Sequence, residues 1–277
     1  MAVKSVLETE QPSLVFLHGL LGTKHDWQAV IDRLPHFDCI SLDLPLHGEQ
    51  KTLAVTDFEQ TCVYLSQKIE SAVGNKPYML IGYSLGGRLA LYYALQSQVE
   101  KGELTGLILE GANLGLLTAA EKQARWDSDQ QWAQRFANEA PSAVLNDWYR
   151  QAVFADLNEA QRQRLIEKRT NNCGENIAQM LLATSLAKQP DFRSLVKEYI
   201  QEQRLQKQQL QKQQLHKQQQ VRSKTFPIHF FCGERDQKFR RQAEQHQLNL
   251  TLIKQAGHNA HTENPDEFAA QLTALFA

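Results

Sequence analysis

The chain has 277 residues, enough for one large domain with a buried core or for a domain that carries an inserted subdomain. Its 30 lysines and arginines nearly balance 31 acidic residues, so no overall field would attract nucleic acid or an anionic membrane. Four scattered cysteines without metal-type spacing indicate reduced thiols, and no apolar run is long enough for a signal peptide or a membrane span. We therefore expect a cytoplasmic protein without a nucleic-acid or membrane partner; the oligomeric state stays open.

Short apolar runs alternate with helical patterns along most of the chain, which is typical of a parallel sheet covered by helices on both faces. Helices are expected over 57–73, 85–96 and 264–276, the last with Pro265 near its first turn. The six expected strands span 13–19, 39–45, 78–84, 104–111, 227–236 and 248–258.

Between Gly111 and Pro227 this alternation stops and the pattern becomes helical, with aromatic residues as apolar anchors. The change indicates an inserted helical cap, which could close a site from water. Helices that merely extend the core are the alternative. The predicted division is a core of 1–113 and 225–277, a cap of 114–197, and a Gln/Lys-rich helical insertion of 198–224.

That insertion contains the repeat LQKQQ, LQKQQ, LHKQQ. On a helix that turns about 100° per residue, a five-residue period rotates successive leucines by roughly 140°. Leu205, Leu210 and Leu215 therefore cannot form a coiled-coil seam. We expect a solvated helix, with a glutamine-rich interaction tract as the alternative.

The sequence Gly82-Tyr83-Ser84-Leu85-Gly86 lies between a predicted strand and a predicted helix. Strand, sharp turn and helix are the context of the nucleophile elbow of α/β-hydrolase folds, where the strained turn leaves no room for side chains at Gly82 and Gly86. The motif therefore predicts the α/β class, with a mostly parallel sheet flanked by helices, and it makes Ser84 the reactive serine.

A serine of this kind needs a base and an acid that orients the base, and in this fold they follow the serine in the chain order Asp or Glu, then His. Asp236 ends the fifth predicted strand, and His258 follows the sixth. Both stand at carboxyl ends of strands, where open α/β sheets place their sites. Glu234, two residues before Asp236, is the competing acid.

The turn His18-Gly19-Leu20 follows the first strand, where this fold presents a backbone N–H group for an oxyanion hole. We assign the two donors to the N–H groups of Leu20 and Leu85. His18 and His47 are expected to be structural, the first as a hydrogen-bonding residue and the second in a turn at a strand end.

Three arginines give a further indication of the substrate. Arg88 lies one helical turn past Ser84, and Arg125 and Arg169 fall in the predicted cap. Guanidinium groups bind carboxylates in a bidentate fashion, so arginines that converge on one serine would select a substrate with several carboxylates. A solvated or ion-paired role is the alternative for each.

The whole chain resembles the 2-succinyl-6-hydroxy-2,4-cyclohexadiene-1-carboxylate synthases, lyases of menaquinone biosynthesis with the α/β-hydrolase fold. The resemblance implies that Ser84, Asp236 and His258 form the triad, that Arg88, Arg125 and Arg169 bind substrate carboxylates, and that Tyr83 and Trp148 line the pocket. It implies no cofactor and no metal. Leu46 departs from the glycine common at its position. The segments that carry the resemblance are LVFLHG, GYSLGGR, SDQQWAQRF, DWYRQAVFADLN, RTNNCGENIAQML, ATSLAKQPD, CGERDQKFR and AGHNAHTENP.

The reaction implied by this resemblance is the loss of pyruvate from a tricarboxylate, 2-succinyl-5-enolpyruvyl-6-hydroxy-3-cyclohexene-1-carboxylate, begun by removal of a proton next to its ketone. The same triad can serve ester hydrolysis, so a carboxylesterase or thioesterase remains the alternative. A scaffold protein that acts through residues 198–224 is a third hypothesis, and the intact order of the triad argues against it.

Overall fold

A six-stranded parallel sheet forms the centre of the computed structural model, which describes residues 11–213 and 225–276. The strand order β2-β1-β3-β4-β5-β6 and the parallel pairing confirm the α/β-hydrolase class expected from the apolar runs. All six predicted strands are present, each somewhat shorter than its apolar run. Their bounds are β1 Ser13–Leu17, β2 Cys39–Leu42, β3 Tyr78–Tyr83, β4 Leu104–Glu110, β5 Ile228–Gly233 and β6 Asn249–Ile253.

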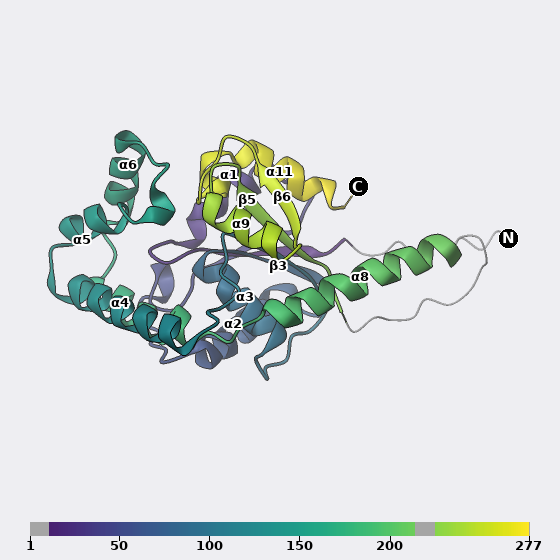
Figure 1. Ribbon diagram of the computed structural model, residues 1–277, viewed down its shortest axis with the longest axis horizontal. Helices are drawn as coiled ribbons and strands as arrows, with labels where there is room; N and C mark the ends of the chain where they lie inside the picture. The colour runs from purple at the N-terminus through teal and green to yellow at the C-terminus, as the bar shows by residue number, and fades with distance from the viewer. Residues whose placement is uncertain (1–10, 214–224, 277) are drawn as a thin grey trace.

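Helices cover both faces of the sheet (Figure 1). Because side chains alternate along a strand, Val15 and Leu17 of β1 join one apolar cluster with α2 and α3, whereas Leu14 and Phe16 join a second cluster with α1 and α11. The helices outside the region between β4 and β5 are η1 Lys24–Trp27, α1 Gln28–Ile31, η2 Gly48–Gln50, α2 Phe58–Val73, α3 Leu85–Leu95, α9 Gln237–Gln245, α10 Ala260–Glu263 and α11 Pro265–Ala274.

The long connection between β4 and β5 is helical, as its sequence pattern predicts. Its helices α4, α5 and α6 stand beside the sheet, on the left in Figure 1. They share an apolar cluster that includes Phe136, Val144 and Ile177 and that also takes in Leu21 of the core. The bounds are α4 Ala119–Asn138, α5 Pro141–Trp148, η3 Ala152–Phe154, α6 Glu159–Arg169, α7 Gly174–Ala183, η4 Leu186–Lys188 and α8 Arg193–Gln213.

Helix α8 runs without a break across the boundary at 197/198 that the predicted division places between cap and insertion. Its first turns are held by the core, since Val196 and Ile200 are buried. Farther along, the side chain of Leu205 is 57% exposed, and the helix extends away from the sheet (Figure 1). Leu215 lies outside the described residues, as does the side chain of Leu210.

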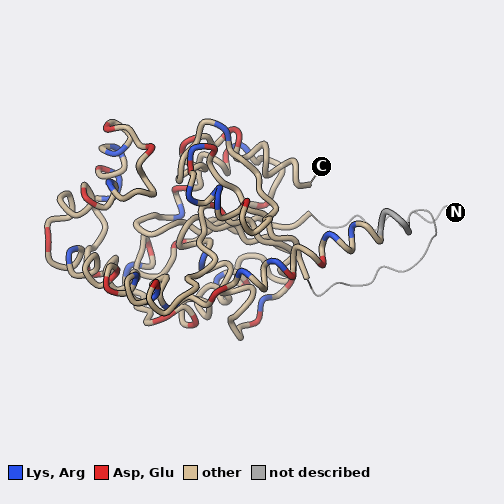
Figure 2. Tube along the Cα trace, in the orientation of Figure 1, with Lys and Arg blue, Asp and Glu red and all other residues tan. Residues whose placement is uncertain are grey.

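Lysine, arginine and acidic residues are interspersed over the described part of the molecule (Figure 2). Within residues 11–213 and 225–276, no helix is both long enough and apolar enough to cross a membrane.

Candidate active site

Ser84 occupies a strained turn between β3 and α3. Its backbone angles are φ 49° and ψ −105°, a left-handed conformation that is unfavourable for any residue with a side chain. Its N–H group donates a hydrogen bond of 2.8 Å to the carbonyl oxygen of Glu110, which ties the turn to the end of β4. A Cβ atom on Gly82 would collide with Gly86, and one on Gly86 with the Leu17 carbonyl. The local geometry is therefore that of a nucleophile elbow.

His258 and Asp236 form a buried pair, with 2.7 Å between His258 Nδ1 and Asp236 Oδ2. The other oxygen of the same carboxylate accepts the N–H of Phe239, whose ring stacks on the imidazole at a centroid distance of 5.1 Å. The competing acid, Glu234, is exposed and accepts the N–H of Gln255 instead. This leaves Asp236 as the acid that orients His258.

Ser84 and His258 line one cavity of about 250 Å³ at the carboxyl ends of the strands, although no hydrogen bond joins their side chains within the described part of the chain. Catalytic hydrogen bonds often tighten only when the substrate binds. Leu20 and Leu85 also line the cavity, and neither amide N–H donates a hydrogen bond among the described residues. The remaining wall includes Arg88, Gly111, Asn113, Arg125, Trp148, Gln151, Phe154, Lys238 and Phe239.

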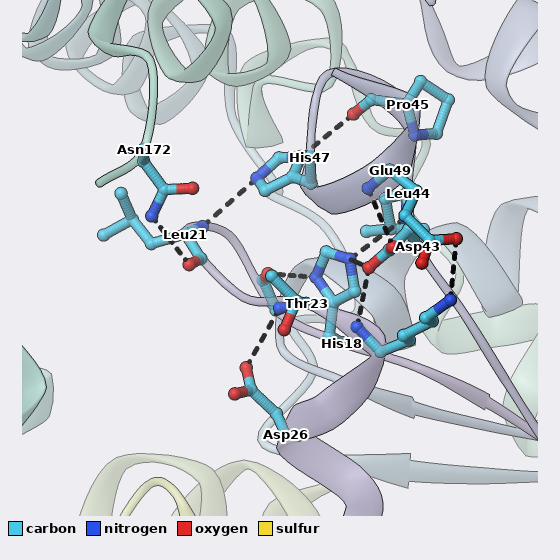
Figure 3. A network of polar contacts seen from close by, with 12 residues as sticks. His18, Leu21, Thr23, Asp26, Asp43, Leu44, Pro45, His47, Glu49 and Asn172 are labelled. Atoms are coloured by element: carbon cyan, nitrogen blue, oxygen red, sulfur yellow. Dashed lines mark hydrogen bonds and ion pairs between the residues drawn. The ribbon is translucent and has the colours of Figure 1, made fainter. Parts of the chain in front are cut away.

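Two buried histidines hold the loop that carries Leu20 (Figure 3). His47 Nε2 accepts the N–H of Leu21 at 3.2 Å, and His18 Nε2 accepts the N–H of Leu44 at 3.0 Å. Each ring uses Nε2 as an acceptor, so each is neutral. Burial lowers the pKa of both, that of His47 to about 3. The two histidines therefore have the structural roles that the sequence analysis gave them.

Leu46 also takes part in this region. Its φ of 64° is left-handed, which explains why glycine is favoured at this position. The leucine keeps the shape of the turn at a cost in backbone strain.

Arg88 is a buried cation that faces the cavity. Its Nη1 donates to the carbonyl of Thr184 at 2.7 Å, and no carboxylate among the described residues lies within 4.0 Å of its guanidinium. Burial, followed by the positive charge of Arg125, lowers the pKa of Arg88 to about 9. Arg125 also lines the cavity, and its Nε binds Asp129 Oδ1 at 2.8 Å.

Arg169, the third expected arginine, is not on the cavity wall. It is buried and pairs with Asp26, with 2.6 Å between Nη2 and Oδ2. Lys168 binds the other oxygen of the same carboxylate at 2.7 Å. Burial alone would raise the pKa of Asp26, but Arg169 and Lys168 hold it below its usual range. These two ion pairs join the end of helix α6 to η1, which follows β1 in the chain.

The two expected aromatic residues also differ in position. Trp148 lines the cavity and packs edge to face against Trp132 at 5.0 Å. Tyr83 is not among the residues that line the cavity, and its ring contacts those of His258 at 5.3 Å and His261 at 4.9 Å. Burial raises the pKa of Tyr83 well above its usual value, so the phenol stays neutral.

Lys238 is a cavity residue that the sequence analysis did not single out. Its side chain is exposed overall but lines the cavity, and no acid lies within 4.0 Å of its ammonium group among the described residues. Desolvation, followed by the charge of Arg125, lowers its pKa. In the sequence, its position two residues after the expected catalytic acid Asp236 could have indicated that Lys238 lies at the site.

Glu110 and His261 form a second buried acid–histidine pair that the sequence analysis missed. Glu110 accepts His261 Nδ1 at 2.7 Å and the His261 N–H at 3.0 Å, while its own carbonyl holds Ser84. Gly111, the next residue, is close to the His258 ring. The position of Glu110 at the end of a buried strand could have indicated in the sequence that this acid has a partner near the site. The pair connects the elbow to the segment that carries His258.

Comparisons with known proteins agree with this geometry. The sequence pattern of the α/β hydrolase fold matches residues 12–265. A solved esterase from Thermogutta terrifontis has a TM-score of 0.69 at 18% identity, covers 96% of this chain and 89% of its own, and supports the fold alone. The chain thus has the fold and the serine elbow that define the α/β hydrolases.

Closer relatives narrow the family. A Haemophilus influenzae protein, provisionally named a 2-succinyl-6-hydroxy-2,4-cyclohexadiene-1-carboxylate synthase, is 54% identical over 94% of this chain and 95% of its own. The synthase of that name from Yersinia pseudotuberculosis is 42% identical over 96% of this chain and 88% of its own. The structure of MenH from S. aureus has a TM-score of 0.78 at 25% identity and covers 96% of this chain and 93% of its own. The chain belongs to the 2-succinyl-6-hydroxy-2,4-cyclohexadiene-1-carboxylate synthase family of α/β hydrolases.

Proposed function

We propose that this protein eliminates pyruvate from 2-succinyl-5-enolpyruvyl-6-hydroxy-3-cyclohexene-1-carboxylate and so makes 2-succinyl-6-hydroxy-2,4-cyclohexadiene-1-carboxylate for menaquinone. The observation that carries the proposal is a Ser84 elbow that shares one cavity with His258 and with two cations, Arg88 and Lys238, that form no ion pair with an acid of the described residues. Family membership supports the same reaction.

In the proposed reaction, Ser84 Oγ removes the proton next to the succinyl ketone and passes its own proton to His258. Asp236 keeps the imidazole in the required tautomer and stabilises its charged form. The electron pair moves onto the ketone oxygen, which the N–H groups of Leu20 and Leu85 stabilise as an enolate. The electron pair then returns to the ring as a C2=C3 double bond, the existing C3=C4 double bond moves to C4=C5, and the C5–O bond breaks. The enolpyruvate that leaves takes up the proton held by His258 and becomes pyruvate.

The substrate carries three carboxylates, and the cavity offers cations to bind them. Arg88 and Lys238 have no acid partner within 4.0 Å among the described residues, and Arg125 shares its charge with Asp129 alone. We propose that these three side chains bind substrate carboxylates, while Trp148 packs against the ring. Arg169 has a structural role, because its ion pair with Asp26 holds η1 against the end of α6.

A carboxylesterase or thioesterase is the less favoured alternative, because a neutral ester gives three cations nothing to bind. The test is to supply the family substrate and follow pyruvate with lactate dehydrogenase, with p-nitrophenyl acetate hydrolysis measured in parallel. We expect rapid pyruvate release, and roughly 10²- to 10⁴-fold less in Ser84→Ala, the range that a positioned proton-transfer group contributes. Rapid ester hydrolysis without pyruvate release would refute the proposal.

A further inference from the structure

The residue after the expected oxyanion donor has a strained backbone. Leu20 and Leu21 are the two central residues of a turn that is closed by a 3.0 Å hydrogen bond from the Gly22 N–H to the Gly19 carbonyl. Leu21 has a φ of 68°. A positive φ at the third residue of a turn usually requires glycine. A leucine retains this conformation only when its surroundings hold it.

Both peptide groups of Leu21 are held by side chains (Figure 3). The N–H donates to His47 Nε2 at 3.2 Å, and the carbonyl accepts Nδ2 of Asn172 at 3.0 Å. His47 comes from the core, where its Nδ1 bonds the Pro45 carbonyl at 2.9 Å. Asn172 comes from the cap segment between α6 and α7. The strained residue is thus fixed from both sides.

The same cap segment also holds the far side of the loop. The Thr23 N–H donates to Asp26 Oδ2 at 3.2 Å, and Asp26 pairs with Arg169 of α6. Asn172 in turn donates to the Arg169 carbonyl at 3.0 Å, so both contacts come from one stretch of the cap. The loop shape therefore depends on the position of the end of α6.

We infer that Asn172 is a positioning residue, which completes the oxyanion hole by holding the Leu21 carbonyl in place. When Asn172 is bonded, Leu21 keeps its left-handed backbone and the adjacent Leu20 presents its N–H to the cavity. When this contact is lost, the turn relaxes and the donor moves out of line. The inference rests on the proposed role of Leu20 as an oxyanion donor.

The test compares Asn172→Ala with Gln179→Ala. Gln179 is a matched control, because its amide also runs from the cap to a core carbonyl, that of Val55 at 3.2 Å, but does not touch the loop. In Asn172→Ala we expect kcat for pyruvate release to fall roughly 3- to 10-fold with KM within about twofold, since one hydrogen bond to the loop is lost. Gln179→Ala should keep both constants within about twofold.

A second measurement does not depend on activity. Hydrogen exchange of the Leu21 amide, followed by NMR in the full chain, should become roughly 3- to 10-fold faster in Asn172→Ala and stay unchanged in Gln179→Ala. Asn172→Asp, which keeps the size but replaces the donor with an acceptor, should behave like the alanine variant. Equal exchange rates in the two alanine variants would overturn the inference. If exchange is faster in Asn172→Ala and the wild-type protein releases no pyruvate, the proposed function is refuted but the positioning role of Asn172 is not.

Discussion

Arg88 is the cavity residue for which we expect the largest effect of a substrate carboxylate. Burial of a guanidinium without a carboxylate partner costs free energy, which a bound carboxylate would offset. We expect Arg88→Ala to lower kcat/KM for pyruvate release roughly 10- to 150-fold, since a hydrogen bond to a charged group contributes about 1.5 to 3 kcal/mol. Slow hydrolysis of a neutral ester should hardly change. Arg88→Lys should recover part of the loss where attraction dominates and none where the planar fork matters.

Two other arginines are comparisons for Arg88. Arg162 binds Glu159 at 2.6 Å away from the cavity wall, so Arg162→Ala should leave both activities near wild type. Arg169→Ala should lower both activities and the melting temperature together, because it removes one of the two cations that neutralise the buried Asp26. If Arg169→Ala abolished only pyruvate release and left stability intact, Arg169 would bind substrate as the sequence analysis predicted.

At the scale of single residues, the sequence is most informative where chain order carries the information. The G-x-S-x-G context and the Ser, Asp, His order led to Ser84, Asp236 and His258, and the last two are a bonded pair. Pairings between distant parts of the chain leave no such pattern. The Asp26–Arg169 and Glu110–His261 contacts join residues that only the folded cap and neighbouring strands bring together.

At the scale of elements, the six strands were predictable because strands buried on both faces read as continuous apolar runs. The connection between β4 and β5 was recognisable as helical, but the arrangement of its helices was not, since the sequence pattern does not say which faces meet. Helix α8 illustrates the difference. Val196 and Ile200 anchor its first turns to the core, although the sequence predicts a solvated helix from residue 198 onward.

The exposed part of α8 should be dispensable. We expect a deletion of residues 207–220 to keep kcat/KM within about twofold and the melting temperature nearly unchanged, because the pentad repeat has no apolar stripe to pack. The deletion leaves in place the anchoring residues and the bond from Gln203 to the Thr225 carbonyl. Ile200→Ala is the comparison, and it should destabilise the protein by about 2 to 5 kcal/mol. A large loss of activity in the deletion variant would show that the repeat takes part in function.

At the scale of the whole molecule, stability should fall in mild acid because neutral histidines are buried beneath the active site. His47 has a pKa of about 3 in the folded protein, set mainly by burial and then by His18, against about 6.5 in an unfolded chain. The unfolded state therefore takes up the proton first as the pH falls. The contribution of His47 to the free energy of unfolding is fully present above pH 6.5 and is lost progressively as the pH falls to about 3.

The expected loss can be measured by urea unfolding. One histidine contributes up to about 1.4 kcal/mol per pH unit below its unfolded pKa, so His47 accounts for roughly 2 kcal/mol between pH 6.5 and 5. His18, whose pKa is also lowered by burial, adds to the loss. His47→Gln keeps an acceptor for the Leu21 N–H but cannot take up a proton, so its unfolding free energy should fall less over this range than that of the wild type. Identical pH dependence in the two proteins would mean that His47 takes up its proton at the same pH in the folded and the unfolded protein, so that the bond from the Leu21 N–H to His47 Nε2 is lost over this pH range.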